Sequence, residues 1–187
     1  MHNLPSLLLL LLVSVPALSL LVFQGVTGVP PLSSNAAEAA DVVALLRQAD
    51  LEASATVYEL GCGWGALLIA LARAFPQARI CGIEISPLPY WVARWRTRKL
   101  PNVCLFRGNF HDCDLSDAQA VTCYLMIKPM PALAGLLDRM LKPGTPVVTV
   151  TFAFRGRSVS AQRQGPGLRG AASLYRWPAR GQIDARV

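Results

Sequence analysis

Positive charge is absent from the first part of this sequence, where no Lys or Arg occurs before Arg47. Residues 4–23 carry no charge of either sign and match the ~20 residues that a helix needs to cross a bilayer. A cleaved signal peptide is the alternative, but it would require a basic stretch before the apolar run. We therefore predict an uncleaved N-terminal transmembrane helix within residues 1–27. Because every Lys and Arg follows this segment, we expect a single-pass protein with its domain on the cytoplasmic side of the membrane.

The sequence also lacks the residue patterns of metal sites and disulfide frameworks. It has two histidines, far apart in the chain, and five cysteines, none of them in a CxxC pair. An odd number of cysteines, most of them inside or beside apolar runs, favours unpaired core thiols in a reducing compartment. We expect no metal and no disulfide among these cysteines: Cys62, Cys81, Cys104, Cys113 and Cys123.

Apolar segments that suit strands alternate with segments that suit helices. This order is typical of βαβ units and of a mostly parallel sheet, so the fold class we predict is α/β. We divide the chain into the anchor at residues 1–27, a linker with a pre-domain helix at 28–56, and one domain at 57–187. The predicted helices are 36–49, 66–75, 90–100 and 132–141, and the predicted strands are 55–60, 78–85, 102–108, 120–127 and 145–154. In the first helix, Val42, Val43, Leu45 and Leu46 should face the core.

Three glycines lie in the predicted turn between the first strand and the helix that follows it, in the stretch ELGCGWG at residues 59–65. Glycine lets the backbone turn sharply and approach a ligand, and the following helix offers unpaired N–H groups. The spacing of Gly61, Gly63 and Gly65 is GxGxG, not the GxGxxG of classical dinucleotide folds. Glu84 ends the next strand, where a carboxylate can accept hydrogen bonds from both ribose hydroxyls. Together these features predict a nucleoside ligand, although a plain surface carboxylate is the alternative for Glu84.

Two basic regions are weaker signals. Trp91 and Trp95 lie four residues apart on the predicted helix 90–100, and we expect them to pack into the core while Arg94, Arg98 and Lys99 form a solvated basic side. A nucleic-acid surface is the less favoured alternative. The C-terminal stretch from residue 155 holds seven arginines and one acid, which suits anionic lipid, an acidic protein or a solvated tail.

The segments ELGCGWG and ICGIE together resemble the cofactor signature of class I S-adenosylmethionine-dependent methyltransferases. With NVCLFRGNFHDCDLSDAQAVTCYLM, MLKPGTPVVTVTFAF and SLYRWPA, the resemblance covers most of residues 57–179. The sequence resembles in particular small membrane-anchored relatives of the mitochondrial lysine methyltransferases that modify the adenine nucleotide translocase and ATP synthase. The resemblance implies a Rossmann-like sheet flanked by helices and S-adenosyl-L-methionine as cofactor.

The resemblance also assigns roles to individual positions. Glu59 would face the methionine moiety of the cofactor, the three glycines would lie against the cofactor, and Glu84 would bind the ribose. Asn109 and Phe110 fall where the family has an acidic residue and an aromatic beside the adenine. An amide at 109 accepts a hydrogen bond without the help of charge, so adenine affinity should be modest.

The sequence gives weaker signals for the acceptor of the methyl group. After the fourth strand the chain has TCYLMIKPMP, without the Asn-Pro-Pro-aromatic signature of enzymes that methylate amide or base nitrogens. Tyr124 is the candidate for lining the acceptor site, and a half-buried strand tyrosine is the alternative. We expect a protein lysine near the membrane as substrate, with no nucleic acid as partner. A catalytically idle nucleoside-binding or scaffold protein, or an enzyme acting on a small molecule or lipid, stays open.

Overall fold

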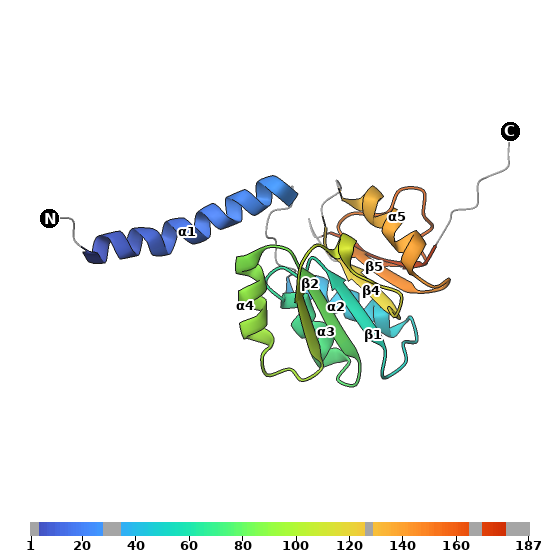
Figure 1. Ribbon diagram of the computed structural model, residues 1–187. Helices are drawn as coiled ribbons and strands as arrows, with labels where there is room; N and C mark the ends of the chain where they lie inside the picture. The colour runs from blue at the N-terminus through green and yellow to red at the C-terminus, as the bar shows by residue number, and fades with distance from the viewer. Residues whose placement is uncertain (1–3, 28–34, 126–128, 165–169, 179–187) are drawn as a thin grey trace.

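The computed structural model describes residues 4–27, 35–125, 129–164 and 170–178 (Figure 1). A seven-stranded sheet has the order β3-β2-β1-β4-β5-β7-β6. The helices are α1 Leu4–Thr27, α2 Ala36–Arg47, α3 Ala66–Ala74, α4 Pro87–Thr97, α5 Met130–Met140 and the 3-10 turn η1 Phe110–Asp112. The strands are β1 Thr56–Leu60, β2 Arg79–Glu84, β3 Val103–Arg107, β4 Ala120–Cys123, β5 Pro146–Val150, β6 Ala161–Arg163 and β7 Ala172–Arg176.

The first five strands run parallel, and β7 is antiparallel to both of its neighbours, β5 and β6. The alternation of strands and helices predicted from the sequence is confirmed from α2 through β5. The result is a mixed sheet flanked by helices, as in Rossmann-like methyltransferase folds. Two strands were missed, β6 and β7, since β6 has only three residues and β7 lies beyond the last predicted element.

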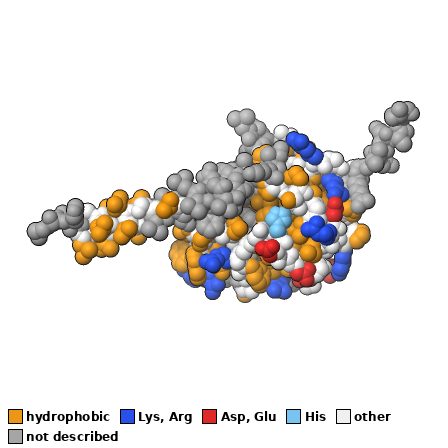
Figure 2. Space-filling model, turned by 45° about the horizontal axis from the view of Figure 1, so that its top comes forward, with side chains coloured by type: hydrophobic (Ala, Val, Ile, Leu, Met, Phe, Trp, Pro, Cys, Tyr) orange, Lys and Arg blue, Asp and Glu red, His pale blue; other side chains and the backbone are white. Residues whose placement is uncertain are grey.

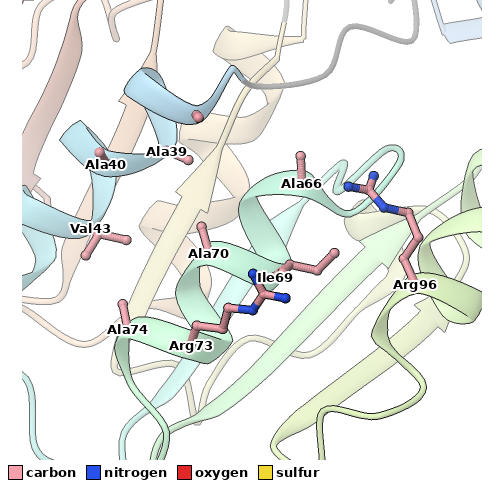
Figure 3. Close-up of a pocket in the computed structure, with 10 residues that line it drawn as sticks. Ala39, Ala40, Val43, Ala66, Ile69, Ala70, Arg73, Ala74 and Arg96 are labelled. Atoms are coloured by element: carbon pink, nitrogen blue, oxygen red, sulfur yellow. The ribbon is translucent and has the colours of Figure 1, made fainter.

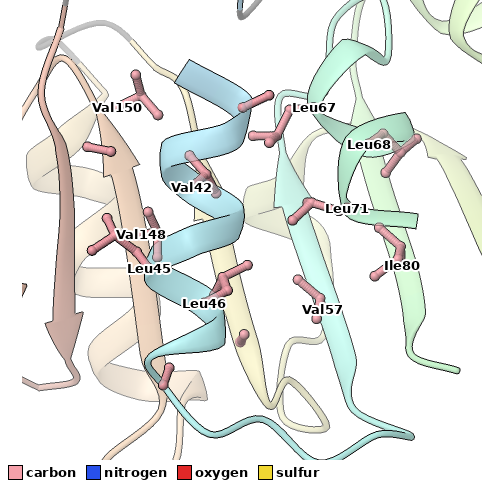
Figure 4. Close-up of a cluster of buried hydrophobic side chains, with 14 of the residues drawn as sticks. Val42, Leu45, Leu46, Val57, Leu67, Leu68, Leu71, Ile80, Val148 and Val150 are labelled. Atoms are coloured by element: carbon pink, nitrogen blue, oxygen red, sulfur yellow. The ribbon is translucent and has the colours of Figure 1, made fainter. Parts of the chain in front are cut away.

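Two layers of apolar side chains cover the two faces of the sheet. On one face, leucines of α2 and α3 pack against β1, β2 and β5 (Figure 4). On the other face, Leu133, Leu136 and Leu137 of α5 pack against β1 and β4. Each fully buried leucine contributes about 1.5 to 3 kcal/mol relative to an exposed one, so these layers fix the positions of the strand ends.

Helix α2 begins with a capping box. Asn35 Oδ1 accepts from the Glu38 backbone N–H at 2.8 Å, and Glu38 Oε2 accepts from the Asn35 N–H at 3.1 Å. Such reciprocal bonds satisfy two N–H groups that the helix itself cannot pair. Val42, Leu45 and Leu46 are buried as predicted, whereas Val43 is half-buried at the margin of that face.

The last strands are tied back to the region of α2. Arg163 Nε of β6 lies 3.1 Å from Asp41 Oδ1, and Arg176 Nη2 of β7 donates to the Ala49 carbonyl at 3.2 Å. The backbone of β7 pairs with β5 along its whole length. The two ends of the domain therefore depend on each other for position.

Helix α1 covers the predicted apolar segment and extends away from the sheet (Figure 1). The leucine side chains that the structure describes in this helix are exposed, among them Leu4, Leu8 and Leu12. Among the described residues, however, no helix combines the length and the apolar character that crossing a membrane requires. The transmembrane helix predicted within residues 1–27 is thus not supported by the described part of the chain.

The prediction that Trp91 and Trp95 pack into the core is wrong. Their side chains are 57% and 63% exposed, while Tyr90, Ala93 and Thr97 form the buried side of α4. At 3.6 residues per turn, positions 90, 93 and 97 lie opposite the stripe that holds both tryptophans. Ala93 and Thr97 leave room for close packing under the helix beside Tyr90, and the two indoles are left outside.

Candidate functional site

Four of the predicted site residues lie at the carboxyl ends of adjacent parallel strands. Glu59 lies near the end of β1, Glu84 ends β2, Asn109 follows β3, and Tyr124 follows β4. Ligands of open α/β sheets bind beyond this edge. The strand order therefore brings these chemically distinct groups to one margin of the sheet.

The glycine turn after β1 requires glycine for two separate reasons. Gly61, Gly63 and Gly65 all have positive φ, at 74°, 52° and 78°, a region that L side chains rarely adopt. A Cβ at Gly61 would also lie 2.8 Å from Leu125 Cδ2, and one at Gly65 would lie 3.3 Å from the backbone Cα of Ala93 on α4. Two of the three predicted cofactor glycines thus have packing roles of their own.

Glu84 closes this turn from the next strand. It is 7% exposed, and its two oxygens accept from the backbone N–H groups of Gly63 at 2.8 Å and Ser86 at 2.7 Å. A carboxylate offers about four lone-pair positions, so two remain for a ligand. Glu84 therefore fixes the conformation of the turn and keeps free acceptor positions, as we expect of a residue that binds ribose hydroxyls.

Glu59 is a buried acid with an oxygen that makes no hydrogen bond. Its side chain is 3% exposed, and Oε2 has no partner among the described residues. Burial, and then the negative charge of Glu84, raise the pKa of Glu59 well above its usual range. An unpartnered buried acceptor is costly unless something satisfies it. A bound cationic or hydrogen-bond-donating group would satisfy it.

Cys62 lies within the same turn but is not poised as a nucleophile. Burial, followed by the charges of Glu59 and Glu84, raises the pKa of its thiol well above the usual range. The reactive thiolate is therefore disfavoured. All five cysteines are unpaired thiols, and three of them are buried.

Asn109 and Phe110 form the start of η1 at the end of β3. Asn109 Oδ1 accepts from the His111 backbone N–H at 3.1 Å, and the Gly108 N–H donates to the Glu84 carbonyl at 3.0 Å. This second bond ties the η1 region to the end of β2. The amide oxygen of Asn109 thus already holds one bond, with one lone pair left for a ligand.

Tyr124 and Phe110 belong to different packing layers. Tyr124 is half-buried against the α2 and α3 layer, whereas Phe110 packs on the α5 layer. Residues 126–128, which continue the predicted fourth strand, lie outside the described residues. Tyr124 therefore stands at the predicted edge of the sheet, and its role in an acceptor site stays a prediction.

Arg96 was not among the predicted site residues. Its Nη1 donates to the Trp64 carbonyl at 2.6 Å, which fastens α4 to the glycine turn. Arg96 also borders a groove of about 520 Å³ between α2 and α3, lined largely by alanines and by Arg73 (Figure 3). The sequence contains no signal for the contact of Arg96 with the glycine turn, because this contact depends on how α4 packs.

Comparisons with known proteins agree with this geometry. The family model of the ANTKMT methyltransferase domain matches residues 59–161. A protein-lysine N-methyltransferase from Saccharolobus islandicus is 35% identical over 103 residues, which cover 54% of this chain and 64% of that protein. A release factor glutamine methyltransferase from Moorella thermoacetica is 38% identical over 72 residues, 37% of this chain and 25% of that protein.

A solved structure shares the fold over most of the chain. The RNA methyltransferase of Salinibacter ruber, in complex with S-adenosyl-L-homocysteine, has a TM-score of 0.69 and 27% identity. The alignment covers 83% of this chain and 98% of that one. The family match begins at Glu59 and includes the glycine turn, Glu84, Asn109 and Tyr124. The chain therefore belongs to the family that carries the ANTKMT methyltransferase domain.

Proposed function

We propose that this protein is an S-adenosyl-L-methionine-dependent methyltransferase. The observation that carries the proposal is the unpartnered buried Oε2 of Glu59, next to a glycine turn whose shape is held by Glu84. S-adenosyl-L-methionine supplies an electrophilic methyl group on a cationic sulfonium, and its amino group is cationic as well. Both charges suit a site that contains two neighbouring acids.

The residues at the strand ends fit this cofactor chemically. Glu59 offers a free acceptor for the amino group, directly or through water, and Glu84 keeps acceptor positions for the ribose hydroxyls. The Asn109 side chain and the Phe110 ring follow β3, where they would lie beside the adenine. In-line methyl transfer depends mainly on alignment, so the site needs no dedicated nucleophile of its own.

We further propose a protein lysine as the methyl acceptor. The S. islandicus relative is a protein-lysine N-methyltransferase that is 35% identical to this chain over 103 residues. The sequence after β4 lacks the Asn-Pro-Pro-aromatic pattern expected for amide nitrogens, which argues against the activity of the M. thermoacetica relative. A lysine amine must lose its proton before attack, and a partly desolvated pocket near Tyr124 would favour the neutral amine.

We also propose that the domain works beside a membrane, on its cytoplasmic side. Two observations support this placement: residues 4–23 carry no charge, and the described leucine side chains of α1 are exposed. An exposed apolar helix of this kind is unfavourable in water. Protease added to sealed vesicles whose cytoplasmic face points outward tests the sidedness. We expect the domain to be digested, and a domain that is protected from the protease would contradict the proposal.

Calorimetric titration of the full chain in detergent tests the cofactor. We expect S-adenosyl-L-homocysteine to bind, NAD not to bind, and Gly63→Val to abolish binding. Gly144→Val is the matched control, because Gly144 also has positive φ but lies at the amino end of β5, away from the site. The absence of heat with the wild-type chain would refute the cofactor assignment.

Transfer of radiolabelled methyl groups into membrane and soluble extracts then identifies the acceptor. We expect label on protein lysine, located by mass spectrometry. Label on glutamine, RNA, lipid or a small molecule would overturn the lysine proposal and leave the cofactor proposal intact. Cofactor binding without any transfer would instead indicate a catalytically idle nucleoside-binding protein.

A further inference from the structure

The exposed side of α4 carries a narrow stripe of aromatic and basic side chains. Trp91, Arg94, Trp95 and Arg98 follow the spacing i, i+3, i+4, i+7, and all four are exposed. This spacing places them on one face of a helix. The contacts expected for a core helix are reversed here, since the opposite side, with Ala93, is the buried one.

The stripe is ordered by contacts among its own members. The Arg94 guanidinium lies 5.6 Å from the Trp91 ring centre, and that of Arg98 lies 4.5 Å from the Trp95 ring centre. Arg94 Nη1 donates to the Tyr90 hydroxyl at 3.1 Å, and Arg98 Nη1 donates to the Trp95 carbonyl at 2.6 Å. A guanidinium has five N–H donors, so each arginine keeps several for an anionic ligand.

Two features of the surroundings point to a lipid surface as the partner. First, α4 contains no acidic residue, and Arg96 on the helix and Lys99 just beyond its end add positive charge. Second, α4 contacts α1, the uncharged helix with exposed leucines. On the side of the domain where α4 lies, hydrophobic and basic side chains occur together (Figure 2). Tryptophan rings favour the interface between water and acyl chains, and arginine pairs with anionic headgroups.

We propose that this α4 stripe is a second membrane contact, which docks the domain flat onto anionic phospholipid headgroups. Trp91 and Trp95 insert at headgroup depth, while Arg94 and Arg98 bind lipid phosphates. The inference rests on the proposed membrane placement but not on methyl transfer. The α4 stripe would fix the orientation of the domain on the membrane. Two separate membrane contacts, α1 and the stripe, restrict the rotation of the domain, whereas α1 alone would not.

Fluorescence quenching on vesicles tests the insertion of the two tryptophans in the full chain. Vesicles of phosphatidylcholine and phosphatidylserine, with brominated acyl chains, should quench wild-type tryptophan fluorescence. In Trp91→Phe/Trp95→Phe the quenching should be largely lost, because the remaining tryptophans are Trp64 in the glycine turn and Trp177, which is 1% exposed. Equal quenching in this variant would overturn the inference.

Vesicle sedimentation tests the role of the arginines. Arg94→Gln/Arg98→Gln should weaken binding to anionic vesicles about fivefold for each arginine, with little effect on pure phosphatidylcholine vesicles. Arg47→Gln/Arg139→Gln removes the same charge from exposed positions on α2 and α5 and should leave binding nearly unchanged. Equal losses in both double variants would reduce the effect to net charge and overturn the inference.

The outcomes separate this inference from the proposals on which it rests. A wild-type chain that does not bind vesicles refutes the membrane placement and the α4 stripe together. Binding without quenching of Trp91 and Trp95 refutes only the stripe. If the tryptophan variants instead lose methylation of a protein substrate in detergent, with vesicle quenching unchanged, the stripe is a protein-docking surface and the lipid assignment is wrong.

Discussion

The Glu84 carboxylate accepts a hydrogen bond of 2.8 Å from the backbone N–H of Gly63, a residue 21 positions earlier in the chain. This bond joins the two sequence features from which a nucleoside site was predicted. The acid thus shapes the turn that faces the ligand as well as carrying acceptors for it. Substitution of Glu84 should affect both properties.

Glu84→Gln should weaken binding of S-adenosyl-L-homocysteine by about 1 to 3 kcal/mol, because charge-assisted hydrogen bonds are lost and one acceptor oxygen becomes a donor. Calorimetric titration measures the change. Glu52→Gln, at an exposed position, serves as the control and should bind like the wild type. Undiminished affinity in Glu84→Gln would contradict the role of this residue.

Glu59→Gln should raise the thermal stability of the ligand-free protein at neutral pH. Burial raises the pKa of Glu59, so the folded state holds a proton that the unfolded state releases above about pH 4.3. Stability is therefore lost as pH rises from that value through the folded-state pKa. The neutral amide avoids this loss, and each kcal/mol recovered should raise Tm by about 2 to 4 °C.

The matching measurement is a pair of thermal denaturation series across pH. At pH 4 the two proteins should melt at similar temperatures, because Glu59 is protonated in both states. The difference should grow toward pH 8. A constant difference at all pH values would show that the gain comes from something other than the ionisation of Glu59.

Gly65→Ala should destabilise the fold by about 2 kcal/mol or more, because it adds backbone strain at positive φ to a collision with α4. Gly144→Ala separates these causes, since Gly144 also has positive φ but no atom within 4 Å of an added Cβ. The Gly65→Ala/Ala93→Gly double variant should recover part of the loss through relief of the 3.0 Å contact with the Ala93 Cβ. Additive effects in urea denaturation would rule out this contact as a cause.

Alkylation by iodoacetamide should divide the cysteines into two groups. Cys62, Cys81 and Cys123 are buried, and burial raises the pKa of Cys81 and Cys123 to about 12. They should resist alkylation at pH 8 in the native protein, while the half-buried Cys104 and Cys113 react faster. Mass spectrometry of timed samples gives each rate. Rapid modification of Cys123 would show that the α5 layer opens readily.

The sequence predicts the central sheet well because its signals are local. Five apolar runs of strand length alternate with helical periods, and each corresponds to a strand of the structure. The glycine turn and Glu84 could be recognised because their chemistry depends on residue type at a fixed place in a βαβ unit. A short-range sequence pattern is therefore enough to locate the glycine turn and Glu84.

Features that depend on packing between distant segments could not be predicted. Trp91 and Trp95 have the spacing of a buried stripe, and only the placement of α4 beside the small residue Gly65 selects Ala93 for burial instead. Likewise, the short segment Ala161–Arg163 of β6 forms a strand because β7 pairs with it, which its own sequence does not signal. Hydrophobic periodicity identifies an apolar face but not its partner.

The link between Arg176 and the Ala49 carbonyl, 127 residues apart, has a consequence for the order of events during synthesis. Translation releases α2 early, yet the pairing of β7 with β5 and the bond from Arg176 to Ala49 after α2 cannot form until residue 176 has been made. The nascent domain therefore stays incomplete over most of its translation. The exposed leucines of α1 are therefore synthesised well before the domain can complete its fold.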